Sequence, residues 1–451
     1  MPSIPILMSA RAVASPRATR AWALALGLAL YVLWVTLTWR FPDRDGIPFP
    51  IVWALALTAT AWAWKRWRGS IGGLEATAIV VVTAMLLTDV TFLWSQGMRD
   101  LVIYLKAGDH FLHGAPVYTD HVITARPADL TEYPFLYPPL TLPLFAVLSL
   151  LPFPITVALW TVASVAAVLI AFRLIGIERR WWLLLLAWPP VLQGLWVGNV
   201  ALLLFVLFAA APRIGGGLVA SVAFKLYSAV TALWLVRERR WADLAAGLAV
   251  VVAAGAITAP LVPAGLWVDW IEGLGYYQRS QVALPDYLYG LGLGRWLPLV
   301  AVAGIGLLVI ALALRGRDSR ERLARLGLAT IVASPSTFAH GFLVGLPSFL
   351  SLRTGLVWLV LGITACSPGL AWWLAPLLGV AAWFAPALGR MPGEDRWHPL
   401  GSNMRPWPVA LVPEPVVSPT GGRRELPGGS VSAKPPQAWD PDGIDERLLP
   451  G

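Results

Sequence analysis

The stretch Pro154–Phe172, PITVALWTVASVAAVLIAF, contains no charged residue. A helix needs about 20 predominantly apolar residues to cross the hydrocarbon core of a bilayer, which is about 30 Å thick. We therefore expect this stretch to span a membrane. Similar apolar runs recur along the chain at 21–38, 49–64, 74–94, 181–197, 199–212, 242–262, 295–314, about 326–338, 340–352, 354–366 and 369–388.

The composition of the whole chain agrees with repeated membrane crossing. Of its 451 residues, 57% are apolar and 13% are charged, whereas soluble domains carry about 25% charge. A soluble enzyme of this composition could not cover its own surface, so the sequence predicts an all-α polytopic membrane protein. The lone Cys366 excludes a disulfide framework, a thiolate zinc site and an iron–sulfur cluster.

The positions of the basic residues predict the orientation. The chain has 34 Lys and Arg against 25 Asp and Glu, and such an excess in a membrane protein marks cytoplasmic loops and not a nucleic-acid surface. The basic residues all lie on the cytoplasmic side of the membrane if the apolar run 139–152 lies at the outer interface and 215–236 is a re-entrant hairpin. This topology gives about twelve crossings of the plasma membrane, with both termini in the cytoplasm.

This topology divides the chain into three parts. Residues 1–20 form a basic cytoplasmic N-terminus, and 21–388 form the transmembrane domain. Residues 389–451 contain 12 Pro, 8 acidic and 7 basic residues, which is typical of a disordered tail. Such a tail either tethers partners through polyproline segments or is a passive extension.

Two long segments, 95–138 and 263–294, then face the outside. Segment 95–138 contains five of the 17 acidic residues that precede the tail and three of the five His. Its periodic apolar positions predict an amphipathic helix on the membrane surface. This clustering of ionisable groups favours chemistry at the outer face.

Two acidic residues are candidates for a catalytic base. Asp100 follows the third apolar run, where a carboxylate at the outer face could take a proton from an acceptor hydroxyl. It could equally be a solvated acid or a helix N-cap. Asp89 lies within the third run and is the second candidate, with an ion pair to a buried base as the alternative.

Three basic residues are candidates for binding an anionic substrate. Lys225 lies at the turn of the proposed hairpin and would bind a phosphate or form a structural ion pair. His340 follows Ser334-Pro335 in a break between apolar runs, where it would donate to a phosphate or to backbone carbonyls. Arg279 borders the second outer segment and would bind phosphate or extend to the membrane edge.

Other motifs indicate which chemistry to expect. The stretch Tyr133–Pro139 is fixed by its prolines and offers Tyr137 to a lipid or sugar groove, or else is a rigid turn. The sequence contains no P-loop, Rossmann fingerprint, HExxH or Asp-x-Asp pair. Catalysis by this chain therefore need not involve a soluble nucleotide.

The order of these motifs resembles glycosyltransferase family 87, the polyprenyl-phosphate-mannose-dependent α-mannosyltransferases of the GT-C superfamily. The resemblance runs from about residue 85 to 350 and rests on five motifs: Asp100-Leu101 with Tyr104, Gly114 and Tyr118; Tyr137-Pro138-Pro139-Leu140; Gly198-Asn199; Phe224-Lys225; and Ser334-Pro335 with His340.

The resemblance implies a GT-C-like fold with about 10–12 transmembrane helices and an active site on the outer face. It implies that Asp100 is the base, and that Lys225 and His340 lie near the donor phosphate or the acceptor. Tyr104, Tyr137, Asn199 and Arg279 are further candidates for binding substrate. A polyprenyl-phosphate-linked sugar would be the donor and a glycolipid or lipoglycan the acceptor.

Two alternatives remain at this point. The first is a GT-C transferase that uses another lipid-phosphate sugar, such as an arabinofuranosyl or glucosyl donor. The second is a transporter of lipid-linked sugars, which predicts internal pseudo-symmetry and ionisable residues at mid-membrane. The halves of the chain are unlike each other, which favours a transferase.

Overall fold

The computed structural model describes residues 81–83, 85, 97–124, 133–365, 368–390 and 398–400. The N-terminus 1–20, the first two apolar runs, Asp89 and most of the proposed tail lie outside these residues. The described part is helical, with two isolated β-bridges, Gly290–Thr337 and Leu352–Gly389.

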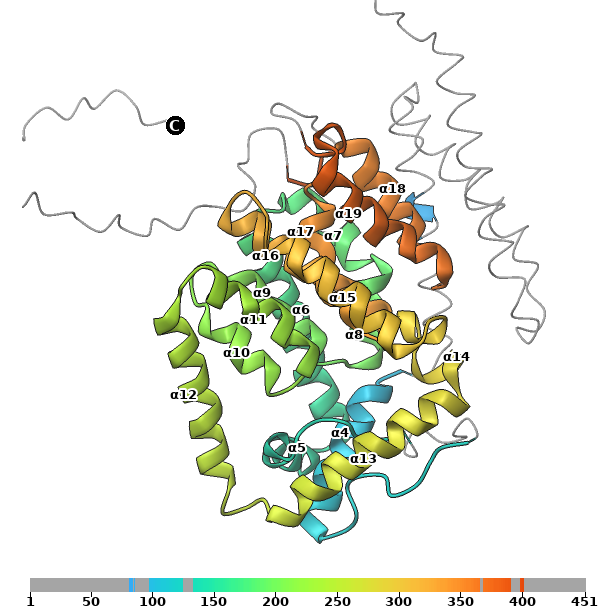
Figure 1. Ribbon diagram of the computed structural model, residues 1–451. Helices are drawn as coiled ribbons and strands as arrows, with labels where there is room; N and C mark the ends of the chain where they lie inside the picture. Colours follow the sequence, from blue (N-terminus) through green and yellow to red (C-terminus); the bar gives the residue numbers. More distant parts are fainter. Residues whose placement is uncertain are drawn as a thin grey trace, which may run out of the picture. The chain divides into compact units, whose positions relative to one another are not determined.

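The helices follow one another closely along the chain (Figure 1). The first group is α4 (Arg99–His113), α5 (Leu142–Ser149), α6 (Phe153–Ile175), α7 (Trp182–Leu186), α8 (Pro189–Val197), α9 (Ala201–Ala210), α10 (Gly216–Val222), α11 (Ala229–Arg237) and α12 (Trp241–Thr258). The second group is α13 (Ala264–Ala283), α14 (Pro285–Leu288), α15 (Leu299–Ala313), α16 (Ser319–Ala333), α17 (Leu346–Phe349), α18 (Thr354–Ala365) and α19 (Leu374–Phe384). Short 3-10 turns join several of them, including η2 (Pro139–Thr141), η4 (Leu226–Ser228) and η6 (Ala339–Gly345).

Two of the described helices are long and apolar enough to cross a membrane. They are α6, which contains the stretch 154–172, and α12, which covers most of 242–262. Only 6% of the apolar window of α12 is buried by protein, and Figure 1 shows α12 at the margin of the helices it accompanies. Its bare apolar surface suits contact with lipid chains.

Other apolar runs are broken where the sequence contains helix-interrupting residues. The run 181–197 divides into α7 and α8 at Pro189, because proline lacks an N–H and fits the first turn of a helix. Helix α8 then ends at Gly198, which has a left-handed conformation with φ of 70°. The predicted hairpin 215–236 also divides, since the backbone is extended at Lys225 between α10 and η4.

The run expected at about 326–338 begins earlier in the structure. Helix α16 starts at Ser319, because the Asp318 side chain accepts hydrogen bonds from the backbone N–H groups of Arg320 and Glu321, both at 2.9 Å. This is an N-cap, which satisfies the unpaired donors of the first helical turn. Arg320, Arg322 and Arg325 therefore lie within the helix and not in the connection that precedes it.

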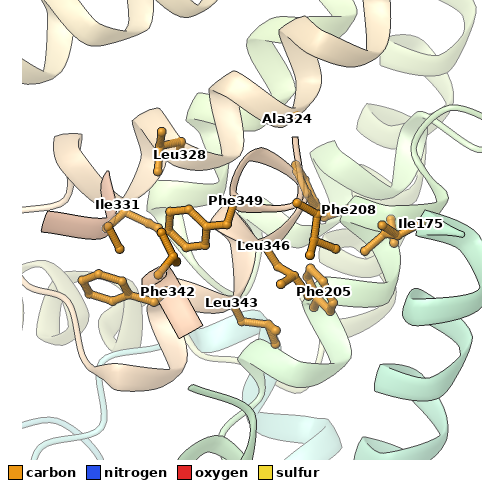
Figure 2. Packing of buried hydrophobic residues seen from close by; sticks show 14 of the residues in the cluster. Ile175, Phe205, Phe208, Ala324, Leu328, Ile331, Phe342, Leu343, Leu346 and Phe349 are labelled. Carbon is orange, nitrogen blue, oxygen red and sulfur yellow. The ribbon is translucent and has the colours of Figure 1, made fainter. Parts of the chain in front are cut away.

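The main apolar core fixes the region around His340. Figure 2 shows Phe208 of α9, Leu328 and Ile331 of α16, and Leu343 of η6 among the buried side chains of this core. Helix α16 approaches η6 closely at Gly327, where an added Cβ would lie 2.4 Å from the backbone oxygen of Val344. The 3-10 turn η6, which carries His340, is therefore held in place by close packing.

A second apolar cluster fixes helix α4. Leu101 and Tyr104 pack against Phe145 of α5 within this cluster. The two helices touch at Gly108, where an added Cβ would lie only 2.3 Å from the backbone carbon of Phe145. The position of Asp100 on α4 therefore depends on this contact.

Candidate active site

One cavity brings together six of the residues that the sequence singled out. It has a volume of about 520 Å³, in the range of about 300–1,000 Å³ typical of ligand sites. Its walls come from α4, the segment 133–138, the break at Lys225, α13 and the segment 334–341. The predicted residues that line it are Asp100, Tyr104, Tyr137, Asn199, Lys225 and His340.

Asp100 lies in the first turn of α4 and is buried, with 8% of its surface exposed. Each carboxylate oxygen accepts a hydrogen bond: Oδ1 from Arg99 Nε at 3.0 Å, and Oδ2 from Asn199 Nδ2 at 2.5 Å. The helix start is itself fixed, because the backbone N–H of Met98 donates to the Trp196 carbonyl at 2.7 Å. The carboxylate is thus held in one orientation toward the cavity.

Asn199 connects Asp100 to Lys225. Its side-chain oxygen accepts hydrogen bonds from Lys225 Nζ at 2.9 Å and from the Ala201 backbone N–H at 2.8 Å. With its oxygen occupied by two donors, the amide can only present its nitrogen to Asp100. Lys225 is therefore connected to Asp100 by two hydrogen bonds that pass through the Asn199 side chain.

Two tyrosines of the cavity form a pair. The hydroxyls of Tyr104 and Tyr137 lie 2.7 Å apart, and the Tyr118 hydroxyl donates to the Tyr137 carbonyl at 2.9 Å. Burial is the main cause that raises the pKa of Tyr104 and of Tyr137 well above the ordinary value. Both hydroxyls therefore stay protonated and can position a substrate oxygen without adding charge.

His340 also lines the cavity, is buried, and is fixed by a residue that the sequence analysis did not identify. Gln193 Oε1 lies 2.8 Å from His340 Nδ1 and also accepts the His340 backbone N–H at 3.2 Å. Since this oxygen can only accept, Nδ1 carries a proton, and Nε2 is the acceptor when the ring is neutral. The signal for Gln193 was a lone amide within the apolar run 181–197.

Arg99 also lines the cavity, and the sequence analysis did not identify it either. Its guanidinium lies 5.4 Å from the centre of the Tyr133 ring, in addition to its contact with Asp100. Its position directly before the predicted base was the available signal. With Lys225, it gives the cavity two cationic side chains.

Arg279 does not line this cavity. Its guanidinium lies over the ring of Tyr276, 4.5 Å from the ring centre. Asp89 lies outside the described residues. Among the residues that the structure describes, no group of three or more His, Cys, Asp or Glu could hold a metal ion.

Comparison with known proteins gives a consistent set of similarities. A family model described as Glycosyltransferase family 87 matches residues 135–335. The chain is 29% identical over 343 residues to a polyprenol-phosphate-mannose-dependent alpha-(1-2)-phosphatidylinositol pentamannoside mannosyltransferase of Mycolicibacterium smegmatis, covering 68% of this chain and 81% of the relative. It is 30% identical over 325 residues to the protein of the same description from Mycobacterium tuberculosis, covering 63% of this chain and 72% of the relative. No solved structure matches the chain.

Proposed function

Because the chain belongs to glycosyltransferase family 87, we propose that it transfers mannose from a polyprenyl-phosphate-linked donor to a hydroxyl of a membrane glycolipid or lipoglycan. The descriptions of both relatives support this donor and this kind of acceptor. The observation that carries the proposal is the cavity itself, in which a buried carboxylate faces the same space as two cationic side chains and a histidine.

Asp100 is the proposed general base. Its carboxylate takes the proton from the acceptor hydroxyl as the oxygen attacks the anomeric carbon of the donor sugar. The bond from that carbon to the phosphate oxygen breaks, and polyprenyl phosphate leaves with the electron pair. A single displacement inverts the anomeric centre, so a β-linked donor gives an α-linked product.

The leaving phosphate needs positive charge and hydrogen-bond donors. Arg99 and Lys225, which line the cavity together with His340, are the proposed source of both. Of these, Arg99 is suited to a bidentate contact with phosphate oxygens, because its guanidinium presents a planar fork of donors. A lipid monophosphate carries less charge than a nucleotide diphosphate, so we propose that no metal cofactor takes part.

The proposed location is the outer face of the plasma membrane, with both termini in the cytoplasm. It is supported by the distribution of basic residues in the sequence and by the apolar surface of α12. The polyprenyl chain would lie in the bilayer beside the cavity, with its phosphate at the level of the cationic side chains.

The remaining alternatives differ in donor or in reaction class. An arabinofuranosyl or glucosyl lipid phosphate would present the same phosphate to the same cations, so the sugar is decided by assay. A transporter would move the lipid-linked sugar without forming a new glycosidic bond. Membership of a glycosyltransferase family favours transfer.

The test uses the full chain in lipid nanodiscs with a polyprenyl-phosphate-mannose donor labelled in the sugar. The expected result is label in a glycolipid product, with release of polyprenyl phosphate, and a loss of at least about 100-fold for Asp100→Asn. Asp109→Asn is the matched control, because Asp109 is an exposed acid on the same helix that does not line this cavity. Full activity of Asp100→Asn would remove the assigned role, and parallel assays with arabinofuranosyl and glucosyl donors would identify another sugar.

A further inference from the structure

A second cavity lies directly beside the first. It has a volume of about 550 Å³ and is formed by α4, the segment 116–124 and the segment 133–135. Three residues line both cavities: Ile103, Tyr133 and Pro134. We refer to this second cavity as the side groove.

One face of α4 connects the two cavities. Asp100, Ile103, Ala107 and His110 follow one another at spacings of three and four residues, which places them on one side of the helix. Asp100 lines the first cavity, His110 the side groove, and Ile103 both. At 1.5 Å of rise per residue, the stripe extends about 15 Å from the carboxylate along the helix.

The wall of the side groove opposite α4 is tied down by buried contacts. The backbone N–H of Ile123 donates to Ser280 Oγ of α13 at 2.7 Å, and the Tyr118 hydroxyl donates to the Tyr137 carbonyl. At the end of α4, His110 Nδ1 lies 2.6 Å from the Pro116 carbonyl. These three hydrogen bonds hold the wall of the groove against α4, α13 and Tyr137.

The chemistry of the lining fits a ligand with many hydroxyls. Lys106 provides donors, Asp120 provides an acceptor carboxylate, His110 provides Nε2 as an acceptor when its ring is neutral, and Tyr133 provides an aromatic ring. Charges of both signs are present, so the lining does not select for an anion. Sugars satisfy such a lining because each hydroxyl both donates and accepts, while the faces of the ring pack on aromatic groups.

We propose that the side groove binds the mannose units of the acceptor that precede the sugar whose hydroxyl is placed at Asp100. This inference rests on the proposed mannosyl transfer and deepens it, because it makes an oligomannoside the preferred acceptor. The acceptor would lie along the α4 stripe, with its reacting end in the first cavity and its earlier sugars in the side groove. The donor phosphate would occupy the part of the first cavity beside Lys225.

The kinetic test compares a long and a short acceptor. Lys106→Met removes an ammonium from the groove, and Val122→Trp fills it with an indole. Each variant is expected to raise KM for an oligomannosyl glycolipid about tenfold or more, while KM for the donor and the rate with an alkyl monomannoside stay unchanged. Asp109→Asn, on the same helix but outside the groove, is expected to leave KM unchanged for both acceptors.

A binding test separates the groove from catalysis. The full-length Asp100→Asn protein is titrated with a soluble oligomannoside, and the titration is repeated with Val122→Trp added. Binding that is lost on filling the groove supports the proposal, even if transfer proceeds from a different donor sugar. Equal loss of activity with both acceptors, or oligomannoside binding unaffected by Val122→Trp, would overturn it. Absence of transfer by the unmodified chain would instead count against the proposed function.

Discussion

The amide nitrogen of Asn199 donates a hydrogen bond to a carboxylate oxygen of Asp100 across 99 positions of the chain, at 2.5 Å. The oxygen of the same amide accepts from Lys225 Nζ. This arrangement places a neutral side chain between the cation and the proposed base. Lys225 can therefore serve the reaction in two ways, by orienting Asn199 and by attracting the phosphate of the donor.

A double-mutant cycle separates these two roles. If Lys225 acts mainly through Asn199, then Lys225→Met and Asn199→Ala each lower kcat by about 10–100-fold, and the double variant is little worse than either single variant. If Lys225 acts mainly on the donor phosphate, the losses add, and Lys225→Met raises KM for the donor. Because Lys225 is a proposed ligand of the leaving phosphate, we expect the additive result with a raised KM for the donor, measured as initial rates over a range of donor concentrations.

Gln193 is expected to be needed for the orientation of His340. Gln193→Leu leaves the buried Nδ1–H and backbone N–H of His340 without their shared acceptor, at a cost of about 1–3 kcal/mol. Thermal unfolding of the purified protein should show this loss, together with a fall in kcat. Gln193→Glu keeps an acceptor oxygen at that position and should retain more stability than Gln193→Leu. Equal stability of the two variants would mean that the hydrogen bonds to Gln193 contribute little.

Much of the site could be predicted from residue type and motif order. Asp100, Lys225 and His340 are conspicuous because charge and histidine are scarce in an apolar chain, and all three line one cavity. Breaks in the apolar runs could also be recognised, since Pro189 and Gly198 interrupt helices by local geometry.

What the sequence could not provide is the pairing between distant segments. Gln193 meets His340 across 147 positions, and Tyr104 meets Tyr137 across 33. Such contacts depend on how the helices pack, which no local pattern encodes. Arg279 was likewise a candidate because of its charge and its position in the segment 263–294, which the sequence predicted to face the outside, yet it lies over Tyr276 and does not line the cavity.

The buried tyrosines predict how stability depends on pH. Burial raises the pKa of Tyr118 and of Tyr137 above the ordinary value of about 10. The unfolded chain therefore loses these protons at a lower pH than the folded chain does. The resulting stability is fully present below pH ~10 and is lost as the pH rises from there toward the folded pKa values. Unfolding midpoints in denaturant should fall above pH 10, less steeply for Tyr118→Phe. An equal fall in the variant would show that Tyr118 does not contribute.

Gly108 of α4 is predicted not to tolerate a side chain. In Gly108→Ala the new Cβ would have to displace the backbone of α5. Built on the present backbone, this Cβ lies 2.3 Å from the backbone carbonyl carbon of Phe145. Overpacking of this kind costs about 1–3 kcal/mol, and it would shift α4 and with it Asp100. We therefore expect a lower unfolding temperature and a lower kcat.

The matched control is Gly304→Ala in α15, where nothing lies within 4 Å of the added Cβ. There the helix gains up to about 1 kcal/mol, because alanine is the better helix former. If Gly108→Ala behaved like Gly304→Ala, α4 and α5 would not be in close contact, and the rigid placement of Asp100 would need another cause.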